Sequence, residues 1–228
     1  MERRITFAPG ECYHIYSRGV DKRPIFLDDA DKEHFMKLLF LCNSAERIEL
    51  RALPSGCSIF DKIRLGTLVD VGAYCLMTNH FHLLLHEKGD GEISNFLRKL
   101  LTAYAMYFNK KYTRKGTLFE SRFQARHIAD DAYFRYLYAY VHLNPVKMIQ
   151  ADWKEKGIKN LVAAQKFLDA YSFSSYRDFI GEKRTEAAIL ERKPFPEYFE
   201  DSADFKKLIS DWLNYKDEEE VFTQVRPV

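Results

Sequence analysis

The spacing of apolar and polar positions predicts a strand and then a helix near the N-terminus. Residues 11–18 (ECYHIYSR) combine aromatic and β-branched side chains and stop before Gly19, a pattern typical of a short strand. From Asp28 onward, apolar residues recur at helical spacing behind an acidic start, which predicts a helix. Residues 45–66 are mixed in charge and contain a Pro-Ser-Gly turn signal, so they predict an inserted loop.

The middle of the chain predicts a hairpin followed by a long helix. Residues 68–77 and 81–87 are two apolar runs that flank Thr78, Asn79 and His80, so they predict antiparallel strands joined by a tight turn, with His80 opening the second strand. Apolar residues at helical spacing from 92 to 112, with lysines at the C-terminal end, predict a second helix.

A fourth strand and a third helix complete the predicted core. Residues 121–129 (SRFQARHIA) are readable as a strand, and Asp130 or Asp131 is placed to cap a helix that runs to about Leu143, before Pro145. The order of these elements predicts an α+β, ferredoxin-like fold with helices on one face of an antiparallel sheet.

Two regions are expected on either side of residue 150. Residues 1–150 form the predicted core, which includes the insertion near 45–66. Residues 151–228 predict a mostly helical extension, because stretches such as 161–171 and 204–213 are helical in character, and the extension carries the acidic run 217–220.

Composition places the chain among ordinary globular proteins. Apolar residues make up 46% and charged residues 30% of the 228 residues, and the net charge is only +2. Any surface for nucleic acid must therefore come from local clustering of basic residues. Four scattered cysteines without a CxxC pair argue against a zinc ribbon, and no apolar run approaches the roughly 20 residues that span a bilayer, so we expect a soluble cytoplasmic protein with reduced thiols.

The sharpest chemical signal is the sequence His80-Phe81-His82. Side chains two apart on a strand point to the same face, so the two imidazoles converge while Phe81 points away. Neutral imidazole is a common ligand for transition metals, although a lone pair of this kind is also compatible with hydrogen-bonded histidines on a half-buried strand. His86 shares this strand parity, but four residues of strand span roughly 13 Å, which is too far for one ion to bridge.

A second signal lies in the predicted third helix, where Tyr140 and Asn144 stand one turn apart and therefore share a face. A tyrosine nucleophile and an amide ligand can occupy that face, and an Asn oxygen added to two imidazoles suits Mn²⁺ or Mg²⁺. The alternatives are structural: the tyrosines pack against the sheet, and the Asn ends a helix before proline.

A third signal is the excess of cations between residues 98 and 127. Aromatic residues are interleaved with these cations, the mixture expected where a groove follows phosphates and bases stack on rings. The candidate nucleic-acid-binding residues are Lys110, Lys111, Arg114, Lys115, Arg122 and Arg126. For Lys110 and Lys111 the alternative is a solvent-exposed helix end without a nucleic-acid contact.

These motifs together resemble the REP-associated tyrosine transposases, within the single-tyrosine HUH transposases and nucleases of the IS200-like superfamily. The similar blocks are YHIYSRGVDKRPIF, AYCLMTNHFHLLL, AMYFNKKYTRKGTLFESRFQA, AYVHLNPVK and FSSYRDFIG, which follow the family order over most of residues 12–181. The chain departs from many members at Thr78, where they carry proline. This departure alters the rigidity of the turn more than its chemistry.

The resemblance implies specific roles and a reaction. By resemblance, His80 and His82 bind a divalent metal, Mg²⁺ or Mn²⁺, Asn144 is the third ligand, and Tyr140 is the nucleophile that forms a 5′-phosphotyrosine with single-stranded DNA. Family members act near short imperfect hairpins, so the resemblance also implies a hairpin-containing DNA partner, with the protein a monomer or homodimer. The base that deprotonates Tyr140 stays open, with His142 and a metal-bound water as candidates.

Two rival functions remain compatible with the sequence. One is a nucleic-acid-binding module that keeps the sheet and the basic groove but performs no chemistry. The other is a metal-dependent nuclease that uses activated water, with Tyr140 only structural. Covalent attachment of DNA to the protein separates the transposase hypothesis from both rivals.

Overall fold

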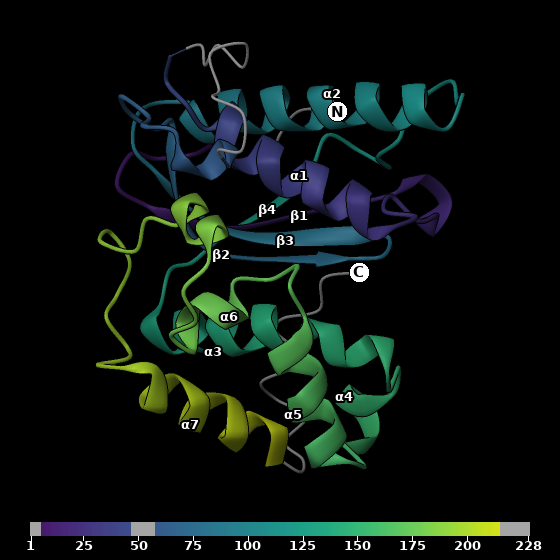
Figure 1. Cartoon of the computed structure of the whole chain (residues 1–228). Coiled ribbons are helices and arrows are strands. Elements are labelled where there is room, and N and C mark those ends of the chain that lie inside the picture. Colours follow the sequence, from purple (N-terminus) through teal and green to yellow (C-terminus); the bar gives the residue numbers. More distant parts are fainter. Residues whose placement is uncertain (1–5, 47–57, 215–228) are drawn as a thin grey trace.

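The computed structural model describes residues 6–46 and 58–214, which fold around one antiparallel sheet (Figure 1). Its strand order is β2-β3-β1-β4, with all neighbouring pairs antiparallel. The α+β, ferredoxin-like prediction is confirmed. Part of the predicted insertion (47–57) and the acidic run 217–220 lie outside the described residues. The strands are β1 (Cys12–Arg18), β2 (Val69–Met77), β3 (His80–Glu87) and β4 (Gln124–His127).

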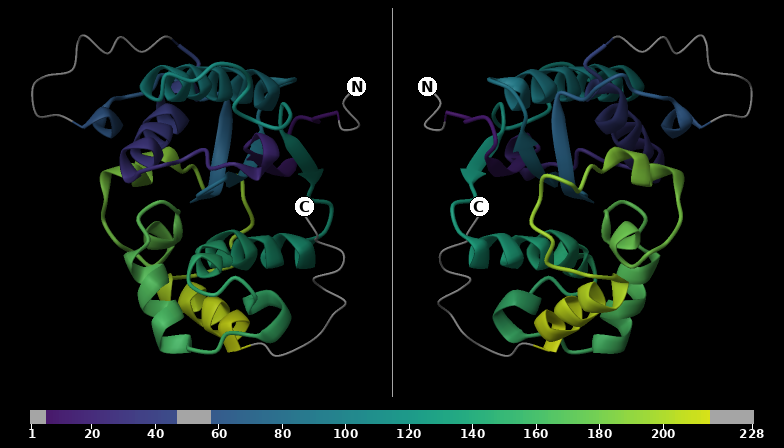
Figure 2. Two further views of the ribbon diagram at one scale, coloured as in Figure 1. Left: turned by 90° about the vertical axis from the view of Figure 1, so that its right-hand side faces the viewer. Right: turned by 90° about the vertical axis from the view of Figure 1, so that its left-hand side faces the viewer.

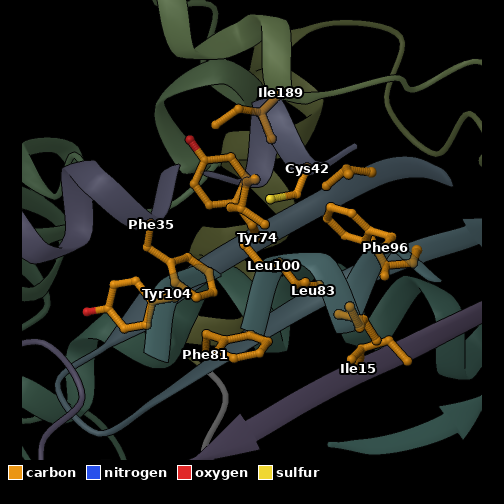
Figure 3. Packing of buried hydrophobic residues seen from close by; sticks show 14 of the residues in the cluster. Ile15, Phe35, Cys42, Tyr74, Phe81, Leu83, Phe96, Leu100, Tyr104 and Ile189 are labelled. Atoms are coloured by element: carbon orange, nitrogen blue, oxygen red, sulfur yellow. The ribbon is translucent and has the colours of Figure 1, made fainter. Parts of the chain in front are cut away.

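Helices α1 (Asp29–Cys42) and α2 (Glu92–Lys111) cover one face of the sheet, as the sequence predicts (Figure 1). The side chain of Asp28 caps α1 by accepting a hydrogen bond from the backbone N–H of Asp31 at 2.9 Å. Between these helices and the sheet lies an aromatic and aliphatic core, shown in Figure 3, in which the rings of Phe35 and Phe81 approach to 5.1 Å. Phe81 therefore turns toward this core, away from the opposite face.

The opposite face is also covered, and in this respect the prediction of helices on one face was incomplete. Helix α3 (Asp131–Leu143) packs there together with α5 (Leu161–Ala170), α6 (Tyr176–Phe179) and α7 (Ser202–Asn214), as both views of Figure 2 show. The short helix α4 (Trp153–Lys156) links α3 to α5. Every residue of β2 is buried, as expected for a strand that is covered on both faces.

The C-terminal extension is joined to the sheet through the free edge of β2. The backbone N–H of Leu76 donates to the carbonyl of Phe173, and the N–H of Ser175 donates to the carbonyl of Tyr74, each at 2.9 Å. A single bridge pairs Cys75 with Ser174 between these bonds. Pairing of this kind covers the backbone groups of an edge strand that would otherwise be available to another chain.

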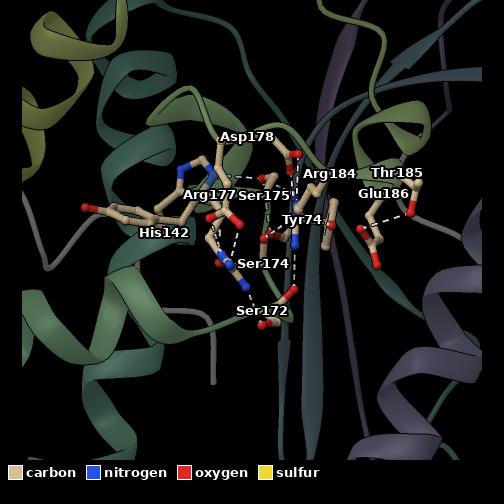
Figure 4. A network of polar contacts seen from close by, with 12 residues as sticks. Tyr74, His142, Ser172, Ser174, Ser175, Arg177, Asp178, Arg184, Thr185 and Glu186 are labelled. Carbon is tan, nitrogen blue, oxygen red and sulfur yellow. Dashed lines mark hydrogen bonds and ion pairs between the residues drawn. The ribbon is translucent and has the colours of Figure 1, made fainter.

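A buried polar network reinforces this junction (Figure 4). The guanidinium of Arg184 forms an ion pair with Asp178, donates to the hydroxyl of Tyr74 at 2.7 Å and donates to the carbonyl of Ser172 at 2.7 Å. Charge-assisted hydrogen bonds with several partners are among the strongest in proteins. Arg184 therefore fixes the FSSYRDFIG segment against β2, which gives that block of the sequence a structural role.

The thiols that the structure describes agree with the expectation of reduced, buried cysteines. Cys12, Cys42 and Cys75 are buried and free, and burial raises the pKa of Cys12 to about 12. Cys57 lies outside the described residues. Within residues 6–46 and 58–214, no helix is long and apolar enough to cross a membrane.

Candidate active site

The two histidines of the HFH motif lie on the sheet face that α3 covers. Their rings stand nearly perpendicular, at 87°, with centroids 5.0 Å apart, while Phe81 between them packs into the opposite core. This is the geometry that strand alternation predicts for His80 and His82. His86 lies farther along the strand, where its Nδ1 pairs with Asp70 at 2.9 Å, and it does not line the same pocket.

Tyr140 reaches the same place from α3. Its ring meets the ring of His82 edge to face, with centroids 5.4 Å apart and an interplanar angle of 83°. Tyr140, His80 and His82 all line one open hollow of about 760 Å³ between the sheet and the segment that follows α3. The structure thus brings the phenol of Tyr140 to two imidazoles that precede it by 58 or more residues in the sequence.

Burial further stabilises the neutral form of this phenol. The side chain of Tyr140 is only 5% exposed, and burial raises its pKa above the ordinary value near 10, although a hydrogen bond from Asn144 opposes the rise. The phenol is therefore neutral at pH 7. Tyr140 can act as a nucleophile only if its proton is removed as the oxygen attacks.

Asn144 lies one turn beyond Tyr140 and is fully buried. Its Nδ2 donates to the backbone carbonyl of Tyr140 at 2.8 Å, and Asn144 itself does not line the hollow. Among the described residues this Oδ1 atom has no hydrogen-bond partner. A buried acceptor without a partner is costly, and a nearby cation is one of the groups that would satisfy it.

The hydrogen bond between His80 and Asn79 sets the tautomer of the His80 ring. Asn79 Nδ2 donates to the carbonyl of Lys22 at 3.0 Å, so the orientation of the Asn79 amide is fixed and its oxygen faces the His80 ring. His80 Nδ1 lies 2.7 Å from that oxygen and must donate a proton to it. The lone pair of a neutral His80 is therefore on Nε2, the nitrogen by which an imidazole held at Nδ1 binds metals.

The two imidazoles that line the hollow are donors suited to a divalent metal. The described residues contain no group of three or more His, Cys, Asp or Glu side chains that could hold a metal. The two imidazoles in the hollow would leave positions for water and for a phosphate oxygen, whereas Asn144 lies outside the lining of the hollow. A zinc site closed by protein ligands would need a further His, Cys or carboxylate.

Two side chains of β1 belong to this site although the sequence analysis did not assign them. His14 is buried, and its Nε2 lies 3.0 Å from Nδ1 of His82. Tyr16 faces the same hollow, with its ring centroid 5.3 Å from that of His14. The alternation within YHIYSR places His14 and Tyr16 on one strand face. It does not show which strand or helix these side chains contact.

The six predicted nucleic-acid-binding residues differ in their surroundings. Lys110, Lys115, Arg122 and Arg126 are exposed, and Arg126 lies directly opposite His14 in the β1–β4 pair, on the face of the site. Arg114 donates to the carbonyl of Thr117, within its own loop. These positions are compatible with a strand of DNA that passes along β4 toward the hollow.

Lys111 forms ion pairs within the protein. Its ammonium contacts Asp28 at 2.8 Å and Asp31 at 2.7 Å, and hydrogen bonds to these carboxylates raise its pKa. The two aspartates come from the start of α1, so Lys111 ties α2 to α1. Because these ion pairs partly compensate its charge, we expect Lys111 to contribute less to DNA binding than the exposed Lys115 and Arg122.

His142 is excluded as the base for Tyr140. Its Nδ1 donates to the carbonyl of Tyr138 at 2.8 Å, and its Nε2 accepts from the hydroxyl of Ser175 at 2.7 Å (Figure 4). Both ring nitrogens are therefore engaged on the side of α3 that faces the C-terminal helices. Burial lowers the pKa of His142 to about 3, so the ring stays neutral in the folded protein.

This buried histidine predicts a loss of stability in mild acid. Below its ordinary pKa of 6.5 the unfolded chain binds a proton at His142 and the folded chain does not. The free energy of unfolding should therefore fall by about 1.4 kcal/mol for each pH unit below 6.5 through this group. Urea unfolding at several pH values between 7 and 5 should show that slope in the native protein and a shallower one in His142→Gln. Equal slopes would contradict the assignment.

Comparisons with known proteins agree with the motifs. Residues 56–144, which include both histidines, Tyr140 and Asn144, match the model of a family described as IS200-like transposases. Among solved structures, the chain is similar to a REP-associated tyrosine transposase bound to a REP hairpin, at 16% sequence identity over 82% of this chain and 90% of that chain, with a TM-score of 0.49. The chain has no significant match among curated proteins. The family match confirms the resemblance to the IS200-like transposases for the segment that carries the candidate site.

Proposed function

We propose that this chain, which matches the IS200-like transposases over residues 56–144, cleaves and rejoins single-stranded DNA. Tyr140 is the nucleophile, and His80, His82 and Asn144 hold a divalent metal, Mg²⁺ or Mn²⁺. The observation that carries the proposal is the convergence of Tyr140 and both histidines on one hollow, with the rings of Tyr140 and His82 in contact.

The reaction is a transesterification in which bonds and protons balance. The phenolic oxygen of Tyr140 attacks the scissile phosphorus, the bond from phosphorus to the 3′ oxygen breaks, and the 3′ oxygen leaves with a proton in place of the one that the phenol loses. The product is a 5′-phosphotyrosine and a free 3′-hydroxyl. Because the phosphodiester energy is kept in the new ester, a 3′-hydroxyl can reverse the step and rejoin the DNA without ATP.

The chain's own residues position this step. Helix α3 holds the Tyr140 ring against His82, so the phenol needs little reorganisation to reach a phosphate in the hollow. When bound, the metal would supply positive charge at a nonbridging phosphate oxygen. Lys147 also lines the hollow and adds a positive charge from the protein itself.

The shape of the site favours single-stranded DNA. The hollow lies between the sheet and a helix layer, where a single strand can bend to present one phosphate. Arg122 and Arg126 are exposed and can bind phosphates of the same strand. The half-buried Tyr16 lines the hollow, where a base can stack on its ring. From the motif resemblance, we propose that a short imperfect hairpin next to the cleavage point is the element that the protein binds.

The test is covalent capture of DNA. A labelled single strand that contains a hairpin should become attached to the protein in Mn²⁺ or Mg²⁺ and stay attached in denaturing gels. Chelation of the metal should prevent the attachment. DNA binding that survives chelation without any adduct would support the non-catalytic module, and cleavage without an adduct would support the water-activating nuclease.

The exposed basic residues predict how DNA affinity depends on salt concentration. Lys115→Ala and Arg122→Ala should each weaken DNA binding and make its dependence on salt less steep, by about 0.7 in the slope of log affinity against log salt for a single strand. The slope is measured by fluorescence anisotropy in a salt titration, without metal.

Lys111→Ala is the matched control for these variants. Its charge is compensated by Asp28 and Asp31, so its removal should lower thermal stability but leave the salt slope of DNA binding unchanged. An equal loss of slope in Lys111→Ala would show that the end of α2 contacts the phosphates as well as the loop that follows it.

A further inference from the structure

The contact between His14 and His82 joins two buried imidazoles from neighbouring strands. Their nitrogens, His14 Nε2 and His82 Nδ1, are 3.0 Å apart, and the two rings stack with centroids 5.1 Å apart and 22° between their planes. His14 pairs directly with Leu84 in the β1–β3 register, so His82 is its diagonal neighbour. The side chains are 1% and 2% exposed, which keeps water from competing for the bond.

This bond has two possible directions, and they have opposite consequences for metal binding. If His14 donates, His82 Nδ1 is the acceptor and a neutral His82 carries its proton on Nε2, which cannot then bind a metal. If His82 donates, its proton is on Nδ1 and the lone pair is on Nε2. Only the second direction puts the lone pair of His82 on Nε2, where a ligand can be bound, because Nδ1 faces His14 in either case.

The second direction also makes the two histidines of the HFH motif equivalent. His80 donates its Nδ1 proton to Asn79, whose own amide is fixed by Lys22. His82 would donate its Nδ1 proton to His14 in the same way. Both rings then present Nε2 to the hollow, as expected where a partner outside the metal shell sets the tautomer of a histidine ligand.

We propose that His14 is a positioning residue for the metal site, which accepts the Nδ1 proton of His82 and thereby holds His82 Nε2 ready for the metal. This inference rests on the proposed function, since it takes His82 as a ligand. His14 touches neither the metal nor the DNA in this role. The rings of Tyr16 and Tyr140, with centroids 5.3 and 5.9 Å from that of His14, enclose it on the side of the hollow.

Two substitutions separate this role from simple packing. His14→Leu fills the buried space but offers no acceptor, whereas His14→Gln keeps an oxygen that can accept the proton of His82. The matched control is His86→Gln, on the same strand face as His82, because His86 pairs with Asp70 away from the hollow. Circular dichroism and the thermal midpoint identify variants that are folded.

The experiment measures Mn²⁺ binding to the full chain without DNA, by electron paramagnetic resonance or calorimetry. His14→Leu should weaken Mn²⁺ binding about 10- to 100-fold, as for other partners of metal-binding histidines, while His14→Gln retains most of the affinity and His86→Gln is unchanged. A folded His14→Leu with the native Mn²⁺ affinity would overturn the inference.

Nitrogen-15 NMR of the histidine rings in the metal-free protein is the second readout, and it does not depend on activity. The proton of His82 should be on Nδ1 in the native protein and should shift toward Nε2 in His14→Leu. A native His82 with its proton on Nε2 would overturn the inference, whatever the binding result.

Failure of the proposed function would appear differently in these experiments. In that case no covalent DNA adduct forms, although Mn²⁺ binding and the His82 tautomer still respond to His14.

Discussion

Replacing Tyr140 by phenylalanine should abolish the covalent DNA adduct and slow strand cleavage by at least about 10³-fold, because the substitution removes the attacking oxygen and leaves the ring in place. The neighbouring imidazoles of His82 and His14 and the wall of the hollow should be unaffected, since only one hydroxyl is lost. The measurement is single-turnover cleavage of a labelled strand in Mn²⁺, resolved on a denaturing gel.

Tyr138→Phe is the matched control for that experiment. Tyr138 lies on the same helix and is similarly buried, but its ring stacks on Phe134 and does not line the hollow. Each substitution should cost only about 1 kcal/mol of stability, so both proteins should be folded at room temperature. Full cleavage by Tyr140→Phe, with Tyr138→Phe also active, would assign Tyr140 to packing alone.

His80→Ala and His82→Ala should each reduce metal-dependent cleavage by about 10²-fold or more, because each removes one of two imidazole ligands from a site with few others. Binding of the DNA strand should change much less, since the exposed basic residues and the ring of Tyr16 are unchanged. The comparison is cleavage rate against DNA affinity for each variant across a Mn²⁺ titration.

High Mn²⁺ should partly restore the two alanine variants, since a weakened site fills at a higher metal concentration. His86→Ala should cleave like the native protein, because His86 pairs with Asp70 at the far end of β3. If His80→Ala and His82→Ala cleave normally in the presence of a chelator, the histidines do not act through a metal.

Much of the fold was accessible from the sequence because it depends on local spacing. The apolar periodicity that predicted helices at 28 and 92 agrees with α1 and α2, and the aspartate cap before α1 was visible as an acidic start. The HFH alternation placed His80 and His82 on one face because strand geometry repeats every two residues.

Other features depend on contacts between distant segments, which periodicity does not contain. The role of Lys111 depends on Asp28, 83 residues earlier in the chain, and that of His142 on Ser175, 33 residues later. A basic helix end and a histidine near a tyrosine look the same in sequence whether or not such partners exist. His14 was missed for the same reason, because only the β1–β3 register brings it to His82.

The second face of the sheet was also missed for a physical reason. The continuous burial of β2 shows that both its faces are covered, but its apolar run alone did not indicate which helices supply the second layer. That layer combines α3 with helices from residues 161 to 214, and α3 carries Tyr140. The C-terminal extension therefore supports the helix that presents Tyr140 to the hollow.

The most direct test of this account is the identity of the side chain that becomes esterified to DNA. After reaction with a single-stranded hairpin substrate in Mn²⁺, protease digestion and mass spectrometry should locate the nucleotide on Tyr140, through the 5′ phosphate of the DNA. Of the four tyrosines on α3 (Tyr133, Tyr136, Tyr138 and Tyr140), Tyr140 is the one that lines the hollow. DNA attached through another residue, or never attached while the strand is cut, would contradict the account.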